Sequence, residues 1–294
     1  MREHAPAPLE LEANAGPHRW RLIARVPASP AGALFWLPAL GVAARHYLPF
    51  ADALATRGIA VFVHEWRGLG TSNLRAGRQC DWGYPAVLLE DIPASLQAIE
   101  RAGFALSHLG GHSLGGQLAC CTLALWHAGR TSPQAPPHGL WLVASGAPYW
   151  RAFPPPLRYG LPLAYRFLPW LAQRVGALPG RLLAFGGNEA RTLIRDWART
   201  GLSGRYAAEG IPDDLEAGMA PLSPHVVGIV LRRDWLAPRS SLDYLLDKLP
   251  RAKRTIVELD GDALGTRADH FAWMKRPDAV VDGLLSARAA PALA

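Results

Sequence analysis

The chain has 294 residues, of which 50% are hydrophobic and 19% are charged, a balance typical of a folded globular protein with a sizeable core. Its formal net charge of +7 comes from scattered arginines rather than a dense basic block, which argues against a nucleic-acid-binding protein. The 3 cysteines are an odd number without C-x-x-C spacing, so they indicate no disulfide framework and favour a reducing compartment.

Neither an export signal nor a membrane span is expected from the apolar segments. The N-terminal residues MREHAPAPLELEANAG contain no apolar core of the kind that a secretory signal requires. The longest apolar run, from Gly32 to Ala44, is interrupted by Pro38 and is too short to cross a bilayer. We therefore expect a cytoplasmic protein, and the sequence gives no indication of its oligomeric state.

Apolar segments rich in β-forming residues alternate with amphipathic segments of helical period along the chain. In chain order, the predicted strands are residues 20–26, 33–37, 59–66, 106–110, 139–145, 226–231 and 255–259. The predicted helices are residues 48–57, 87–101, 114–128, 240–249 and 271–285. Pro93 predicts a break in the second helix near Asp91. This alternation is typical of a mostly parallel sheet with helices on both faces.

The alternation stops between about Ala147 and Ser223, in a segment rich in proline and aromatic residues. The segment is too long for an ordinary connection, so we expect an insertion that packs on the core. The predicted division is a helical cap of residues 148–222 on a discontinuous core of residues 1–147 and 223–294. Within the cap, Asn188 is the expected N-cap of a helix.

A serine lies among glycines where one predicted strand meets the helix that follows it. The stretch Gly111-His112-Ser113-Leu114-Gly115 matches G-x-S-x-G, a pattern in which small residues leave room for a serine on a sharp strand-to-helix turn. Such a turn holds the hydroxyl above the sheet and directs a helix N-terminus at any negative charge that forms nearby. Ser113 is therefore the predicted nucleophile.

A serine nucleophile requires a base and an orienting acid, which follow it in the order serine, acid, histidine in this arrangement. Asp234 comes just after the predicted strand 226–231, and His270 is the only histidine after Asp234. These two residues complete the predicted triad. Asp260 and Asp262 also follow a strand and are the alternative acids.

Two backbone N–H groups are expected to stabilise the oxyanion of the reaction. One is that of Leu114, the residue after the nucleophile. The other should come from the loop after the second predicted strand, where Pro38 has no N–H. In this loop Leu40 is the preferred donor, with Ala39 and Gly41 as alternatives.

The aromatic residues of the insertion give the only indication of the substrate. They could wall an apolar pocket over the serine, suited to an acyl chain or an aromatic ester, or they could form a small core inside the cap. The candidate substrate-lining residues are Trp150, Phe153, His46 and His112, and structural packing explains the two histidines equally well.

These residues together resemble the α/β-hydrolase superfamily of serine hydrolases, and in particular a little-characterised bacterial branch of it. The likeness rests on LPALGV, EWRGLGTS, GGHSLGGQLA, RRDWLAP and ADHF, and further segments extend it from about Phe35 to Trp273. It implies an α/β-hydrolase fold and the triad Ser113, Asp234 and His270, but no substrate. Two departures from the pattern are Glu65, where many relatives have aspartate, and Asp269, where a glycine often precedes the histidine.

We therefore expect a serine hydrolase that cleaves small-molecule carboxylic esters through an acyl-enzyme intermediate. The alternatives are a peptidase or amidase, an acyltransferase with the same triad, and a non-catalytic binding protein that keeps the fold. The sequence contains no P-loop, dinucleotide-binding turn or clustered metal ligands, so no cofactor, metal or nucleic acid is expected. The expected partner is a small ester or acyl substrate.

Overall fold

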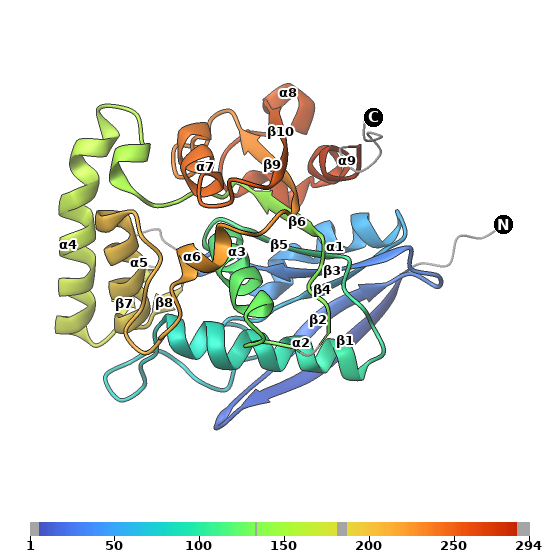
Figure 1. Cartoon of the computed structure of the whole chain (residues 1–294), viewed down its shortest axis with the longest axis horizontal. Coiled ribbons are helices and arrows are strands. Elements are labelled where there is room, and N and C mark those ends of the chain that lie inside the picture. The colour runs from blue at the N-terminus through green and yellow to red at the C-terminus, as the bar shows by residue number, and fades with distance from the viewer. Residues whose placement is uncertain (1–5, 133, 181–186, 287–294) are drawn as a thin grey trace.

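The computed structural model describes residues 6–132, 134–180 and 187–286. A sheet of eight strands, in the order β1-β2-β4-β3-β5-β6-β9-β10, lies at the centre between two layers of helices (Figure 1). The neighbours from β4 to β10 are parallel, whereas β2 is antiparallel to both β1 and β4. The predicted fold class, a mostly parallel sheet flanked by helices, is confirmed.

The strands of the sheet match the predicted positions, with one addition at the N-terminus. They are β1 (Ala7–Ala15), β2 (His18–Val26), β3 (Gly32–Leu37), β4 (Ile59–Val63), β5 (His108–His112), β6 (Gly139–Val143), β9 (His225–Leu231) and β10 (Lys253–Leu259). The unpredicted strand, β1, forms an antiparallel hairpin with β2. A separate two-stranded ribbon joins β7 (Leu178–Pro179) to β8 (Asn188–Glu189).

The structure contains nine helices in the described ranges. They are α1 (Leu48–Ala55), α2 (Ile92–Arg101), α3 (Leu114–His127), α4 (Leu157–Val175), α5 (Arg191–Ser203), α6 (Leu215–Met219), α7 (Arg239–Leu246), α8 (Gly261–Leu264) and α9 (Asp278–Ser286). Of these, α1, α2, α3 and α7 lie close to predicted positions. A π-helical segment over Ala86–Asp91 runs directly into α2, and Asp91 and Ile92 keep helical dihedral angles, so the helix changes its hydrogen-bond pattern near Asp91 instead of breaking there as predicted. Short 3₁₀ turns cover Ala44–Tyr47, Trp150–Ala152 and Ala272–Lys275.

Two further local predictions are wrong. The single helix predicted for residues 271–285 is divided into a 3₁₀ turn and α9, because Pro277 lacks an N–H and forces Arg276 out of the helical conformation. Asn188 does not cap a helix, because it lies in β8. The helix α5 begins three residues later, after Ala190, which makes no side-chain cap.

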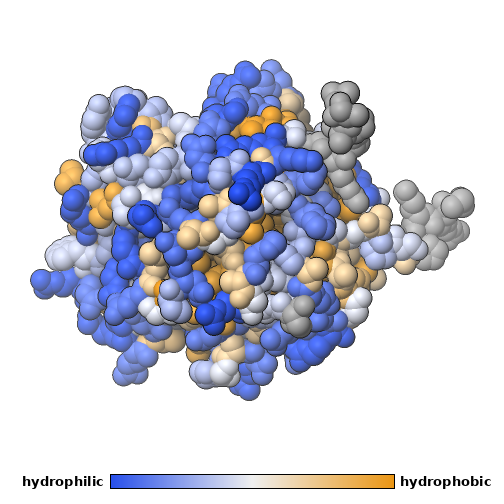
Figure 2. Space-filling model, in the orientation of Figure 1, coloured by the Kyte–Doolittle hydropathy of each residue, from blue (hydrophilic) through white to orange (hydrophobic). Residues whose placement is uncertain are grey.

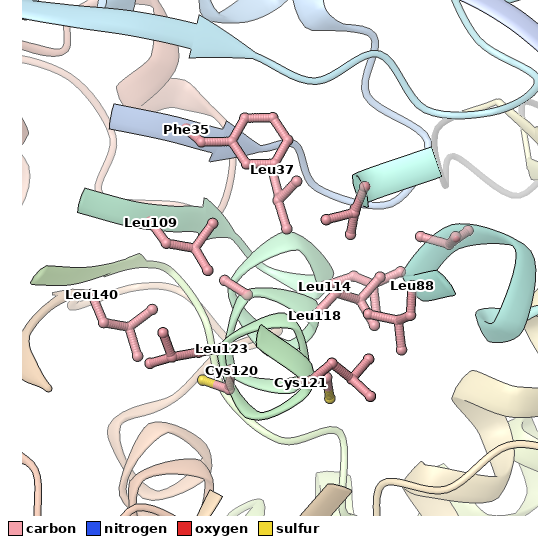
Figure 3. Packing of buried hydrophobic residues seen from close by; sticks show 14 of the residues in the cluster. Phe35, Leu37, Leu88, Leu109, Leu114, Leu118, Cys120, Cys121, Leu123 and Leu140 are labelled. Carbon is pink, nitrogen blue, oxygen red and sulfur yellow. The ribbon is translucent and has the colours of Figure 1, made fainter. Parts of the chain in front are cut away.

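The core fills both faces of the sheet. Strands β4, β5 and β6 are buried along their whole length, as expected for parallel strands covered on two sides. On one face α1 and α9 pack over the sheet, and on the other α2, α3 and α7 do so. Figure 3 shows the second of these layers, in which Leu118 and Leu123 of α3 lie among Phe35, Leu109 and Leu140 from three neighbouring strands.

Between β6 and β9 the chain leaves the sheet and forms α4, α5 and α6. Helices α4 and α5 pack closely because Gly201 has no side chain: a Cβ there would lie 2.6 Å from the ring of Tyr165. The Tyr165 ring also lies 5.0 Å from that of Trp197, and its hydroxyl donates to the Pro148 carbonyl at 2.5 Å. Among the described helices, none has the length and apolar character needed to cross a membrane.

Candidate active site

The turn between β5 and α3 holds Ser113 in an unusual backbone conformation, with φ 55° and ψ −121°. Only glycine fits at the positions two residues before and two residues after Ser113. A Cβ on Gly111 would lie 2.3 Å from the carbonyl carbon of Gly115, and a Cβ on Gly115 would lie 2.0 Å from the Leu37 carbonyl oxygen. The glycines therefore bring three backbone segments close together, and strain of this kind in a non-glycine residue often marks a functional site.

Asp234 and His270 meet at the ends of β9 and β10. The Nδ1–H of His270 donates to Oδ2 of Asp234 at 2.7 Å, and both side chains are buried. The other oxygen of Asp234 accepts hydrogen bonds from the N–H groups of Leu236 and Ala237, at 2.9 and 3.1 Å. This fixes the carboxylate and leaves Nε2 of the neutral imidazole as a free proton acceptor.

Ser113 and His270 line the same pocket, whereas Asp234 lies outside its lining. The pocket wall combines residues that follow β3, β5 and β9, the segment after α8 that carries His270, and part of the β6–β9 segment. Its lining is mainly apolar: Ala39, Leu40, Leu114, Gln117, Gly146, Pro148, Phe153, Leu157, Leu161, Tyr165, Trp197, Trp235, Leu236, Ala237 and Phe271.

The alternative acids do not reach His270. Asp260 caps α8 by accepting from the Ala263 N–H at 3.0 Å, and Asp262 lies in the first turn of that helix. The unusual Asp269 accepts from the N–H groups of Phe271 and Ala272, at 3.1 and 2.8 Å. It thus stabilises the 3₁₀ turn that follows the histidine.

Behind the pocket, a buried tyrosine joins two parts of the site. The Tyr47 hydroxyl accepts a hydrogen bond from the Ala39 N–H at 2.8 Å and is also hydrogen-bonded to Nδ1 of His112 at 2.8 Å. Burial, together with the nearby His270, holds the pKa of His112 well below its usual range, so this ring stays neutral. The rings of His112 and His270 lie 4.7 Å apart, and sequence reasoning did not find Tyr47.

This contact also narrows the choice of oxyanion donors. The N–H of Ala39 is already hydrogen-bonded to Tyr47, so it is not available to a substrate. Gly41 lines a separate hollow and not the pocket that contains Ser113. Leu40 and Leu114 both line the pocket, and Leu114 is the first residue of α3, where N–H groups lack helical partners.

Of the four candidate substrate-lining residues, one lines the pocket and three do not. Phe153 lines the pocket. His112 is fully buried beside His270, and His46 is exposed at the hollow that contains Gly41. Trp150 is not part of the pocket lining, and its ring packs against the Arg151 guanidinium at 4.8 Å.

Glu65, the other departure from the family pattern, ties together the loops after β3 and β4. Its buried carboxylate accepts from the N–H groups of Ala44 and Thr71, at 3.0 and 3.1 Å. Burial raises the pKa of this carboxyl despite those hydrogen bonds. Glutamate thus has a supporting role next to the loop that carries Leu40.

The parallel sheet, the strained serine turn and the helical layers define an α/β hydrolase. The chain belongs to the hydrolase family described as serine aminopeptidase, S33, whose model matches residues 28–196. The resemblance seen in the sequence is thereby confirmed. None of the curated proteins compared with this chain matches it.

Solved structures with the same fold cover nearly the whole chain at low identity. A hydrolase from Pseudomonas aeruginosa PA01 is 20% identical with a TM-score of 0.58, over 98% of this chain and 100% of that one. The 2-hydroxy-6-oxo-6-phenylhexa-2,4-dienoate hydrolase of Rhodococcus sp. strain RHA1 is 20% identical with a TM-score of 0.62, over 97% and 100%. The esterase domain of a Rhodothermus marinus protein is 16% identical with a TM-score of 0.59, over 96% of each chain. At these identities the likeness shows the fold alone.

Proposed function

We propose that this hydrolase cleaves carboxylic esters, with Ser113 as nucleophile, His270 as general base and Asp234 as the acid that orients it. The observation that carries the proposal is the 2.7 Å hydrogen bond between Asp234 and His270, with that histidine and Ser113 in the wall of one apolar pocket. The strained conformation of Ser113 gives independent support.

In the first half of the reaction, the Ser113 hydroxyl oxygen attacks the ester carbonyl carbon while its proton passes to Nε2 of His270. The tetrahedral intermediate collapses, the ester C–O bond breaks and the alcohol leaves with the proton from His270. In the second half, a water molecule attacks the acyl-enzyme and gives its proton to His270. The acid is then released, and the proton returns to Ser113.

The oxyanion of both intermediates is stabilised in this proposal by the N–H groups of Leu40 and Leu114. Both residues line the pocket, and the neighbouring Ala39 N–H is already bound by Tyr47. Loss of one such donor typically costs a factor of about 10²–10³ in turnover.

The pocket favours an apolar acyl or aromatic group over a charged substrate. No Asp, Glu, Lys or Arg is present among the described residues of its lining, so nothing there pairs with the amino terminus of a peptide. Phe153, Leu157 and Leu161 supply apolar surface from residues 148–222, which we propose act as a cap on the core formed by residues 1–147 and 223–294.

Labelling with a fluorophosphonate probe tests the nucleophile. We expect the probe to modify Ser113, located by peptide mass spectrometry, and to leave the Ser113→Ala variant unmodified. Labelling at another serine, or none in folded protein, would overturn the proposal.

A series of p-nitrophenyl esters with acyl chains of increasing length tests the substrate class, with aminoacyl p-nitroanilides as the comparison. The apolar lining predicts that kcat/KM rises with chain length until the pocket is filled. A preference for the charged aminoacyl substrates would favour the aminopeptidase alternative instead.

A further inference from the structure

The outer face of α4 consists of hydrophobic side chains that lie in solvent. Tyr159, Leu163, Phe167 and Trp170 follow one another at intervals of four, four and three residues, which places them on one side of the helix. Their exposed fractions are 67%, 71%, 51% and 53%. Phe167 and Trp170 also pack on each other, with ring centroids 5.7 Å apart.

This exposure is concentrated rather than scattered. Of the large hydrophobic side chains that are exposed in the described ranges, all lie on α4 or at the pocket: the other three are Val175 at the end of α4 and the pocket residues Trp235 and Phe271. At the left edge of Figure 2, where α4 lies, hydrophobic residues interrupt a surface that is otherwise mostly hydrophilic. A contiguous apolar stripe of this kind is typical of an interaction surface.

The charged residues of α4 are all basic. Helix α4 carries Arg158, Arg166 and Arg174, and the sequence contains no Asp or Glu between Glu100 and Glu189. The guanidinium of Arg174 lies 5.6 Å from the centre of the Trp170 ring, and that of Arg158 lies 5.7 Å from the Tyr159 ring. The face thus combines aromatic and aliphatic groups with cations at its margins.

We propose that the outer face of α4 binds the surface of a negatively charged lipid bilayer. A helix with Trp, Phe and Leu on one face and arginines beside them lies in the interface between headgroups and acyl chains, where each basic residue is attracted to anionic lipid. A protein partner with an acidic rim is the less favoured occupant, because Leu163 and the three aromatic side chains protrude from a convex helix rather than lining a groove.

The opposite side of the same helix faces the pocket. Leu157, Leu161 and Tyr165 line the pocket that contains Ser113, so docking through α4 places that pocket beside the bilayer. The lipid binding does not depend on the chemistry proposed for Ser113, and its test is independent of hydrolysis.

Co-sedimentation of the full chain with sucrose-loaded vesicles tests the proposal. We expect binding to vesicles of mixed phosphatidylcholine and phosphatidylglycerol, weak binding to phosphatidylcholine alone, and a loss of binding at high salt. The combined variant Leu163→Ser, Phe167→Ser and Trp170→Ser should lower the partition coefficient at least about tenfold, because it removes the inserted apolar groups.

A pair of charge-reversal variants separates the local effect from net charge. Arg166→Glu with Arg174→Glu, on α4, should also lower binding at least about tenfold. The matched control, Arg19→Glu with Arg101→Glu, makes the same charge change at exposed arginines on β2 and α2 and should keep most of the binding. Circular dichroism and thermal unfolding establish that each variant is folded.

Three outcomes would overturn the proposal: no binding to anionic vesicles, equal binding by the serine variant, or equal losses in the two arginine pairs. Self-association of the wild type in sedimentation velocity, abolished by the serine substitutions and without lipid binding, would instead assign the face to a second copy of this chain. Loss of ester hydrolysis in the Ser113→Ala variant with vesicle binding intact would support both proposals separately.

Discussion

Two regions of this molecule bring a serine together with a histidine that is hydrogen-bonded to an aspartate, and they differ in almost every other respect. In one region the serine lines the same pocket as the histidine, and in the other it is hydrogen-bonded to it. One is the pocket site of Ser113, His270 and Asp234. In the other, Oγ of Ser72 lies 3.0 Å from Nε2 of His18, and Nδ1 of His18 lies 3.0 Å from Oδ1 of Asp91. The exposed fractions of His18 and Asp91 are 0%, and that of Ser72 is 3%.

In the cluster of Ser72, His18 and Asp91, the serine and the aspartate make further hydrogen bonds to the surrounding protein. The hydroxyl of Ser72 accepts from the N–H groups of Gly68 and Leu74, at 3.0 and 3.2 Å. Arg67 donates to both oxygens of Asp91, at 2.9 and 2.7 Å. Burial opposes ionisation of Asp91, but the hydrogen bonds from His18 and Arg67 hold its pKa below the usual range. The cluster thus fastens the loop after β4 to β2 and to the start of α2.

The comparison teaches that three residue types at hydrogen-bonding distance do not define a catalytic site. The serine must also be reachable, and its hydroxyl must not be committed to the backbone. Ser113 lies on a strained turn in a pocket wall, whereas Ser72 is sealed in a loop junction. The four predictions below test whether the Ser113 site is needed for catalysis and the Ser72 cluster for stability.

The largest expected effect is on catalysis at Ser113. Ser113→Ala should lower kcat/KM for a p-nitrophenyl ester about 10⁴-fold or more, because no other nucleophile lies in its place. The matched substitution Ser72→Ala should leave kcat/KM of the folded protein close to the wild-type value. Equal losses in the two variants would remove the distinction between the two regions.

The next effect is on stability at Asp91. Asp91→Asn leaves the largely buried guanidinium of Arg67 with only the half-exposed Glu90 as a charged partner, and it should lower the free energy of unfolding in urea by about 3 kcal/mol. Asp52→Asn is the control, because Asp52 pairs with Arg25 at the surface and is half exposed, so its loss should cost less than about 1 kcal/mol. Similar costs for the two variants would contradict the structural role assigned to Asp91.

A smaller effect is expected at Tyr47, which links the loop after β3 to His112. Tyr47→Phe leaves the Ala39 N–H and His112 unpaired in the interior and should cost about 2 kcal/mol of stability. Because the loop that carries Leu40 loses this support, kcat should fall about tenfold with little change in KM. Tyr206→Phe removes a buried hydroxyl that has no hydrogen-bond partner and should change neither quantity. An unchanged kcat in Tyr47→Phe would show that Tyr47 serves packing alone.

The smallest effect is on the pH dependence of stability and comes from His64. This residue is fully buried, and its Nδ1 lies 2.9 Å from Oγ of Ser95. Burial lowers the pKa of His64 from 6.5 to about 3, so below pH 6.5 the unfolded chain binds a proton that the folded chain does not. The free energy of unfolding should therefore fall by about 1 kcal/mol between about pH 6.5 and about pH 5.5 because of this residue. Urea unfolding of wild type and His64→Asn at about pH 6.5 and about pH 5.5 compares the two slopes. Parallel slopes would contradict the assignment.

The fold could be predicted from the sequence because its signals are local. Periodicity located the strands and helices of the core, and glycines at 111 and 115 are required by backbone contacts too close for any side chain. Chain order alone selected His270, since no other histidine follows Asp234 in the sequence. The triad remains a prediction, although its acid and its base lie within hydrogen-bonding distance.

What the sequence did not reveal depends on contacts between distant residues. The role of His112 is set by Tyr47, 65 positions earlier, and no local pattern joins the two. The Ser72 cluster escaped notice for the same reason, since His18 and Asp91 are 73 positions apart. Strand β1 was missed because its alternating polar and apolar residues are mostly exposed and its pairing with β2 is what orders it.

The burial of two cysteines in α3 has a practical consequence. Cys120 and Cys121 are inaccessible, and burial raises the pKa of Cys120 to about 12 and that of Cys121 well above its usual value, so neither forms a reactive thiolate. Cys80 is partly exposed, two residues from Arg78, whose guanidinium donates to the Arg174 carbonyl at 3.0 Å. A maleimide dye or spin label should therefore attach at Cys80 alone, giving the unaltered chain a single reporter beside the end of α4.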